Sequence, residues 1–202
     1  MSLKDAKVNF LVDIATDLFM CRSINEVTIK DIAVSAQVGE ATIYRTFGNK
    51  QNIVVQAAMK LQGIVSANFF KLQEGKNGYE KLVIFYQSYL DIFNKHPEFY
   101  KFLEEFDAVV SIDNNDNVNP YETAIDSYKV FFMKAYELGL KDGSIKKQDD
   151  INLFYFSTTH ALLELCKKLA FKRAVLKQDK QNEKTGEIKC LIDIILMSLN
   201  NL

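Results

Sequence analysis

The sequence predicts an all-α protein with a small N-terminal domain and a larger helical domain. The 202-residue chain has only two prolines and eight glycines, which favours long uninterrupted helices. Apolar residues recur at three- and four-residue spacing in most segments, and no segment alternates as a strand would. We expect about nine helices, divided between a first domain over residues 1–48 and a second over residues 49–202.

The first expected helix precedes residue 22, because its apolar positions keep helical spacing: Val8, Leu11, Ala15 and Leu18. Residues 28–50, TIKDIAVSAQVGEATIYRTFGNK, then predict two short helices joined by a tight turn. Thr28 and Asp31 have the spacing of a capping box at the start of the first. Its inward positions share one face: Ile29, Ile32, Ala33 and Ala36. The turn is formed by residues 37–39.

The second short helix presents a polar and aromatic face to solvent. Ile43 and Phe47, four residues apart, point inward. The positions left facing out are Glu40, Ala41, Thr42, Tyr44 and Arg45. A short helix held in this way is typical of a helix-turn-helix, whose recognition helix enters the DNA major groove. A hairpin that serves only as core is the alternative that spacing leaves open.

The pattern TIKDIAxxAxVxxxTIYxxFxxK resembles the DNA-binding signature of the TetR family of transcriptional regulators. The resemblance is close over about residues 8–55 and loose over the later helices. It implies that Tyr44 and Lys50 hold DNA phosphates and that the recognition helix contacts the bases. The residues predicted to bind DNA are therefore Thr28, Glu40, Ala41, Thr42, Tyr44, Arg45 and Lys50.

Four residues depart from the family pattern. Ser23 replaces the usual glycine after the first helix, and Gln37 stands in the turn where glycine is frequent. Gly39 replaces a frequent serine or threonine cap and supplies no side-chain oxygen. Thr46 occupies a position where tyrosine or histidine is common. None of these changes alters the apolar frame, so the predicted fold is kept.

Charge is unusual for a DNA-binding domain, which is commonly basic. The first 50 residues carry six basic and six acidic side chains, and the whole chain has a net charge of −1. Arg45 and Lys50, with Lys4 or Lys7, must therefore face DNA while the acids lie behind. Glu40 either accepts a hydrogen bond from cytosine or interacts favourably with the positive N-terminal end of the helix dipole. We prefer the second role. We expect weak non-specific affinity.

Composition narrows the other classes of function. The three cysteines and two histidines have no metal-ligand spacing, so no metal or other cofactor is expected. Acidic residues interrupt the N-terminal segment that a signal peptide would need, and no run of about eighteen apolar residues could span a bilayer. We therefore expect a cytoplasmic protein without a membrane partner.

The second domain is expected to be entirely helical. Asn49 is a candidate cap for a helix from Lys50 to about Phe70. Gly139 is expected to end a later helix as a left-handed cap. The remaining helices are expected over residues 79–94, from 97 onward, over 119–138, 149–173 and 187–200, with polar loops at 113–119 and before 187.

Aromatic residues are concentrated in this second domain. Most must form core, but a helical bundle rich in rings and hydroxyls can also enclose an apolar cavity. The family resemblance implies an effector pocket there. The residues selected for it are Phe102, Tyr128, Phe132 and His160, with a fully buried, satisfied side chain as the alternative for the histidine.

The last two helices carry apolar residues on more than one face, which predicts that a second copy covers one of them. A two-fold homodimer with a four-helix interface fits the family and a palindromic operator. The residues assigned to this interface are Leu162, Leu169, Leu191 and Ile195.

Two classes of function follow from the sequence. The first is a ligand-responsive, dimeric transcriptional regulator, most often a repressor, that is released from a double-stranded operator by a small apolar or aromatic effector. The rival is an all-α carrier or enzyme with an apolar cavity and a structural hairpin. The chain shows no nucleophile–base pair, carboxylate pair or phosphate-binding glycine loop, so we expect no enzyme. A regulator whose effector is a protein also stays open.

Overall fold

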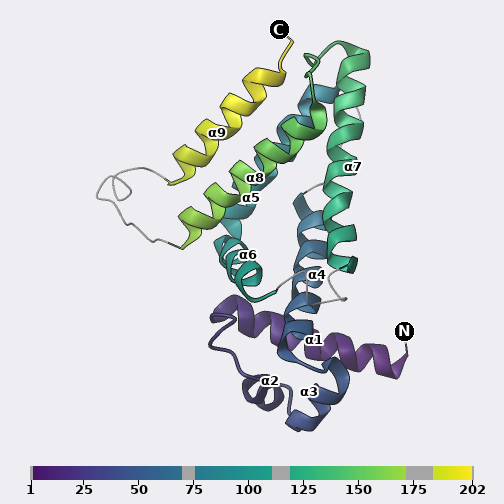
Figure 1. Cartoon of the computed structure of the whole chain (residues 1–202), viewed down its shortest axis with the longest axis vertical. Helices are drawn as coiled ribbons and strands as arrows, with labels where there is room; N and C mark the ends of the chain where they lie inside the picture. Colours follow the sequence, from purple (N-terminus) through teal and green to yellow (C-terminus); the bar gives the residue numbers. More distant parts are fainter. Residues whose placement is uncertain (1, 70–75, 111–118, 172–183, 202) are drawn as a thin grey trace. The chain divides into compact units, whose positions relative to one another are not determined.

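The computed structural model describes residues 2–69, 76–110, 119–171 and 184–201. Within these ranges the chain forms nine α-helices and no strand (Figure 1). They are α1 (Leu3–Cys21), α2 (Ile29–Ser35), α3 (Glu40–Phe47), α4 (Lys50–Phe69), α5 (Gly78–Lys95), α6 (Pro97–Val109), α7 (Asn119–Asp142), α8 (Ile151–Ala170) and α9 (Lys184–Leu199). The predicted all-α class is confirmed for this part of the chain. No helix in it is both long and apolar enough to cross a membrane.

Local capping explains where the N-terminal helices begin. The backbone N–H of Asp31 donates to Thr28 Oγ1 at 3.1 Å, and that of Thr28 donates to the Asp31 carboxylate at 2.7 Å. This reciprocal pair is the predicted capping box of α2. At the start of α4 the N–H of Asn52 donates to Asn49 Oδ1 at 2.9 Å, which confirms the predicted cap.

The predicted end of α7 is wrong. The helix continues through Gly139 to Asp142, and the left-handed residue is Gly143, with φ of 77°. Gly139 is helical, and a Cβ at this position would overlap the side chain of Ile145, so the glycine permits close packing here.

Other boundaries lie near the predicted ones. Helix α8 begins at Ile151 after its cap Asp150, two residues later than predicted, and α9 begins at Lys184, three residues earlier. Residues 113–118 of one predicted loop and residues 172–183 before α9 lie outside the described part of the chain.

The chain divides into two compact units, and each combines two separate stretches of sequence. The first consists of Met1–Ile64 with Lys101–Ile125, and the second of Val65–Tyr100 with Asp126–Leu202. The predicted domain boundary lies after residue 48, whereas the compact units divide the chain within α4. The reason is that the first half of α4 is part of the core formed with the preceding helices.

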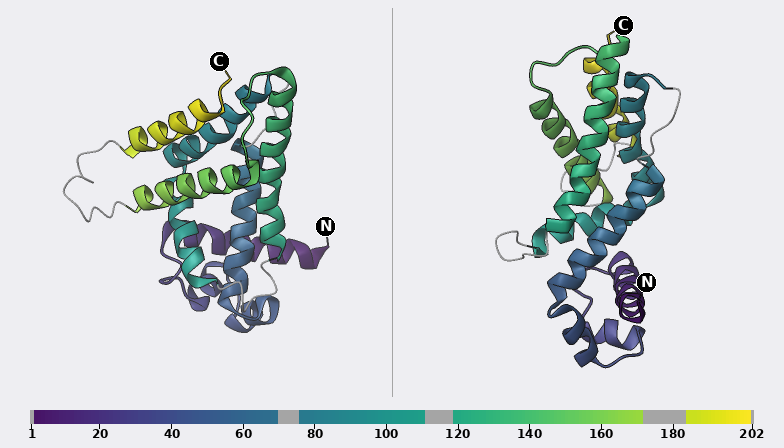
Figure 2. Two further views of the ribbon diagram at one scale, coloured as in Figure 1. Left: turned by 45° about the horizontal axis from the view of Figure 1, so that its top comes forward. Right: turned by 90° about the vertical axis from the view of Figure 1, so that its right-hand side faces the viewer.

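In the first unit, α1, α2 and α3 pack around the start of α4 (Figure 2). Five residues of α4 are fully buried: Ile53, Val54, Val55, Ala57 and Ala58. These positions span about 200° of the helix circumference, so α4 is covered on more than one side. From α1 and α3, Leu11, Ala15 and Ile43 are also fully buried.

Helix α6 closes this unit through polar and aromatic contacts. Ser23 Oγ donates to Glu105 Oε2 at 3.0 Å, and the backbone N–H of Ile24 donates to the same oxygen at 2.5 Å. The rings of Phe19 and Phe102 lie 6.4 Å apart. The Glu105 carboxylate thus connects α6 to the turn between α1 and α2 through two hydrogen bonds. The contact also gives a role to Ser23, where the family commonly has glycine.

The second unit has an aromatic core between α5, α7 and α8. Helix α9 packs on α5 and α8 (Figure 2). Phe132 of α7 lies 5.5 Å from Phe85 and 5.0 Å from Tyr155, measured between ring centroids. The Tyr86 hydroxyl is 2.7 Å from Thr158 Oγ1. Burial raises the pKa of Tyr155 to about 12, as expected for a phenol removed from water.

Close approach of α5 to α7 depends on a second glycine. A Cβ on Gly78 would overlap the backbone of Gly139 and lie 2.6 Å from the Ala135 carbonyl oxygen. The Gly78 N–H also donates to Asp142 Oδ2 at 2.9 Å. The beginning of α5 is therefore fixed against the end of α7 with no space for a side chain.

We expect Gly78→Ala to lower the free energy of unfolding by about 3 kcal/mol, because backbone rather than a flexible side chain must move. Gly63→Ala is the matched control. Gly63 is helical and exposed, nothing lies within 4 Å of its added Cβ, and the change should stabilise α4 by about 0.5–1 kcal/mol. Urea unfolding at fixed protein concentration measures both, and equal effects of the two variants would contradict the packing described.

We expect Glu105→Ala to lower the free energy of unfolding by about 1.5–3 kcal/mol, because two donors lose a charged acceptor. Ser23→Ala should cost about 1 kcal/mol alone and less when Glu105 is already absent, because both changes remove the same bond. Glu104→Ala, the neighbouring carboxylate on α6, should change stability by less than about 0.5 kcal/mol. Strict additivity of the first two substitutions in urea unfolding would argue against the contact.

Candidate nucleic-acid interface

The turn between α2 and α3 is tight and slightly strained. The N–H of Val38 donates to the Ala33 carbonyl at 2.9 Å, and that of Gln37 to the Val34 carbonyl at 3.1 Å. Gln37 has φ of 54°, and no other non-glycine residue in the described ranges has a positive φ. The strain explains why glycine is frequent at this position. The turn nevertheless closes, and it brings α3 against α2.

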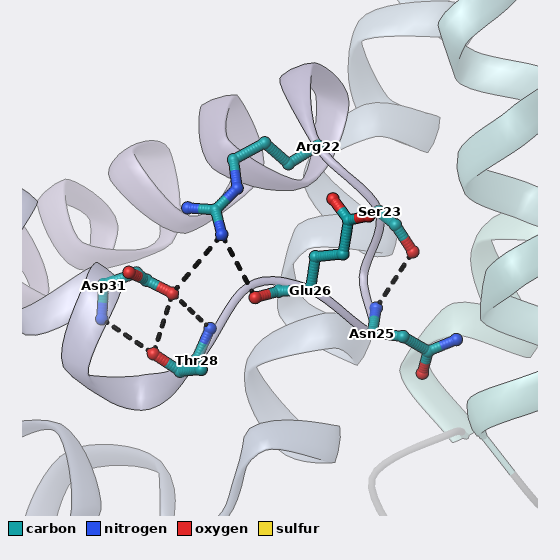
Figure 3. Close-up of polar contacts among 6 residues, drawn as sticks. All are labelled: Arg22, Ser23, Asn25, Glu26, Thr28 and Asp31. Atoms are coloured by element: carbon teal, nitrogen blue, oxygen red, sulfur yellow. Dashed lines mark hydrogen bonds and ion pairs between the residues drawn. The ribbon is translucent and has the colours of Figure 1, made fainter.

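A polar network surrounds the start of α2 (Figure 3). One Arg22 nitrogen lies 3.1 Å from the Glu26 carbonyl oxygen and 3.7 Å from Asp31 Oδ2. Hydrogen bonds from the Thr28 backbone N–H and then from its hydroxyl lower the pKa of Asp31. The Thr28 hydroxyl both donates to and accepts from Asp31, so its role in this structure is that of a cap. A contact between Thr28 and DNA stays a prediction.

Helix α3 separates an inward from an outward face, as predicted. Ile43 is fully buried and Phe47 is 8 % exposed. The exposed residues of the helix are Glu40, Ala41, Tyr44 and Arg45, whereas Thr42 is half-buried. Gly39 caps α3 without a side-chain hydrogen bond, as its sequence implies. The exposed face of α3 therefore carries the carboxylate of Glu40, the methyl group of Ala41, the phenol of Tyr44 and the guanidinium of Arg45.

The Thr46 hydroxyl is used within α3, because it donates to the Thr42 carbonyl at 2.7 Å. This residue, where the family commonly has a larger polar ring, is half-buried. It is therefore part of the support of the helix rather than of its exposed face.

Lys50 is the first residue of α4 and is half-buried. Burial lowers the pKa of its ammonium group, while the carboxylates of Asp31 and Glu105 oppose this change. A phosphate oxygen at the N-terminus of α4 would accept hydrogen bonds from backbone N–H groups and would be attracted by the Lys50 ammonium group. Arg45 differs, because it is exposed and makes no hydrogen bond or ion pair within the described residues.

The four residues predicted to line an effector pocket are divided between the two compact units. Phe102 belongs to the first unit, where it packs on Phe19 and Phe106. Tyr128 and Phe132 are buried in the second unit. His160 is exposed on α8, with its ring centroid 5.7 Å from that of Phe156, which corrects the expectation of a buried histidine. A small-molecule pocket lined by these residues stays a prediction.

The described residues do form a small pocket in the second unit, with a volume of about 130 Å³. Its walls are Asn77, Tyr79, Gly143, Ser144, Asn200 and Asn201. It is smaller than the roughly 300–1,000 Å³ of typical ligand pockets, and none of the four predicted residues lines it, so it does not match the expected effector site. No group of three or more metal-binding side chains occurs in the same ranges.

The predicted dimer residues are mostly used within the chain itself. Leu162 is fully buried, and Leu169 and Ile195 are 8 % and 5 % exposed, because these residues face the layer of α5, α8 and α9. Only Leu191 is half-exposed. The apolar residues of α8 and α9 that remain accessible are different ones: Leu153, Phe156, Ile194 and Met197. The apolar pattern of the sequence includes these four residues as well. It does not indicate which face of each helix is covered by other helices of the same chain.

Comparison with known proteins agrees with this geometry. Residues 11–57 match the family model described as bacterial regulatory proteins, tetR family. The HTH-type transcriptional repressor KstR2 of Rhodococcus jostii (strain RHA1) is 26% identical over 159 residues, which cover 75% of this chain and 74% of that protein.

Two solved structures share the fold. A transcriptional regulator from Saccharomonospora viridis in complex with choline has a TM-score of 0.70 at 20% identity, covering 98% of this chain and 99% of that one. FadR from Bacillus subtilis in complex with stearoyl-CoA has a TM-score of 0.69 at 15% identity, covering 95% and 98%. The N-terminal helix-turn-helix of this chain, with the exposed face of α3, is therefore that of the tetR family of bacterial regulatory proteins.

Proposed function

We propose that this transcriptional regulator is a repressor that binds a palindromic operator as a homodimer and is released by a small apolar or aromatic effector. The observation that carries the proposal is the exposed polar face of α3, held by the buried Ile43 and Phe47. Two such faces about 34–36 Å apart would enter successive major grooves on one side of the duplex. The repressor KstR2, with which this chain shares 26% of aligned residues, supports repression over activation.

The effector is proposed to bind in the aromatic second unit. Two proteins with this fold were solved with choline and with stearoyl-CoA, so the architecture accommodates small molecules in those proteins. In this chain the second unit offers ring edges and phenol groups, including Tyr86 and Tyr155. A coupling of about 1–3 kcal/mol between effector and operator would change operator affinity about 5- to 150-fold. The effector's identity calls for a ligand screen.

The first test of the function is a selection of operator sequences from a random duplex pool at about 50 and 200 mM salt, a range over which phosphate-driven binding weakens steeply. A palindromic motif with half-sites one turn apart is expected. If folded protein enriches no motif, the proposal of sequence-specific DNA binding is contradicted. The rival carrier hypothesis would then gain support.

We expect Lys50→Ala to weaken binding to the selected operator and to reduce the salt slope by about 0.9, because one phosphate charge contact is lost. Tyr44→Phe should weaken binding without changing that slope, because it removes a neutral hydroxyl. Fluorescence anisotropy at several salt concentrations measures both effects. Lys146→Ala, an exposed lysine in the second unit, is the control and should leave affinity and slope unchanged. Unaltered binding by the Lys50 and Tyr44 variants would exclude the proposed phosphate contacts.

We expect a charge on the exposed face of α9 to weaken the dimer. Ile194 and Met197, one helical turn apart, are 59 % and 77 % exposed. A glutamate at either position would have to be desolvated in an interface, so dissociation should increase by at least about tenfold, or roughly 1.4 kcal/mol. Sedimentation measures the change. Leu140→Glu, at an exposed apolar position on α7, is the control. Equal dissociation of all three variants would contradict an interface on this face of α9.

A further inference from the structure

We infer that Arg45 reads a guanine in each operator half-site, by donating to guanine O6 and N7 in the major groove. The inference rests on the proposed operator-binding function and extends it to base preference. Arg45 is the only basic residue of α3, and it lies on the exposed face of that helix. Its guanidinium makes no hydrogen bond or ion pair in the part of the chain that the structure describes.

The order of side chains around α3 gives this face a polarity. With about 100° of rotation per residue, Glu40 and Arg45 lie about 140° apart, at the two edges of the exposed face. Tyr44 and Ala41 lie between them. The two charges thus meet different base pairs. The carboxylate of Glu40 repels the acceptor-rich edge of guanine, so a guanine is favoured only beneath the Arg45 edge.

Close approach of Arg45 to the base edges is sterically open. Ala41, one turn earlier and on the same side, has only a methyl group and does not hold the helix away from the groove floor. Helix α3 has eight residues, so Arg45 still lies in its second turn. A planar guanidinium fits the two acceptors of guanine in a bidentate manner, and such a pair favours guanine over another base about 5- to 150-fold.

Neighbouring cations have other partners or another position. Arg22 is bound to the Glu26 carbonyl and near Asp31, and Lys50 is half-buried and interacts with two carboxylates. Lys30 is exposed but belongs to α2, outside the recognition helix. Arg45 therefore combines a charge that is free of intramolecular partners with a position on the base-reading element.

The test compares operator selection by the unaltered protein with selection by Arg45→Ala, Arg45→Lys and Lys30→Ala. The unaltered protein should enrich one guanine per half-site that Arg45→Ala no longer selects, while the rest of the motif persists. Arg45→Lys should keep the charge but discriminate this base less well. Lys30→Ala removes the same charge from the same domain and should leave the motif unchanged. Urea unfolding checks that each variant is folded.

A chemical change in the DNA isolates the contact. Replacing that guanine by 7-deazaguanine removes the N7 acceptor and should weaken binding of the unaltered protein at least about fivefold, with almost no effect on Arg45→Ala. A uniform loss of affinity for all sequences in Arg45→Ala, with a lower salt slope, would identify a phosphate contact and overturn the inference. A motif without an Arg45-dependent guanine would overturn the inference alone, whereas no motif from the unaltered protein would overturn the proposed function as well.

Discussion

Burial of the first half of α4 is the constraint on which the placement of the recognition helix depends. Ile53, Val54 and Ala57 are fully buried in the core that α1, α2 and α3 share. A short helix such as α3 has little stability of its own, since isolated helices of fewer than about 12 residues are marginal. Its orientation therefore comes from Ile43 and Phe47, which pack into this core, and from the turn at Gln37. The exposed face of α3 is thus positioned by the packing of Ile43 and Phe47 on its opposite face.

Glu105 extends this constraint to α6. A single carboxylate oxygen receives the Ser23 hydroxyl and the Ile24 backbone N–H, while the same carboxylate also interacts electrostatically with Lys50. Movement of α6 within the first unit would thus affect both the turn before α2 and the lysine at the start of α4.

Local features of this fold could be predicted from the sequence, because they depend on residues close in the chain. The capping pair of Thr28 and Asp31 and the buried Ile43 are examples. The contact from Ser23 to Glu105 could not, because it joins residues 82 positions apart and leaves no periodic signal. Leu162 shows a third situation. The sequence indicates that Leu162 lies on an apolar helix face. It does not indicate whether that face is covered by the chain's own helices or by a second copy.

Charge decides what kind of DNA reader this domain can be. Six basic and six acidic residues in the first 50 provide little general attraction to phosphate, and Arg22 already forms an ion pair with Asp31. Non-specific binding grows with the number of phosphates neutralised, whereas base contacts act only at the correct site. A near-neutral surface would therefore lower affinity for bulk DNA more than affinity for the proposed operator. The ratio between the two, which governs occupancy in a genome, rises as a result.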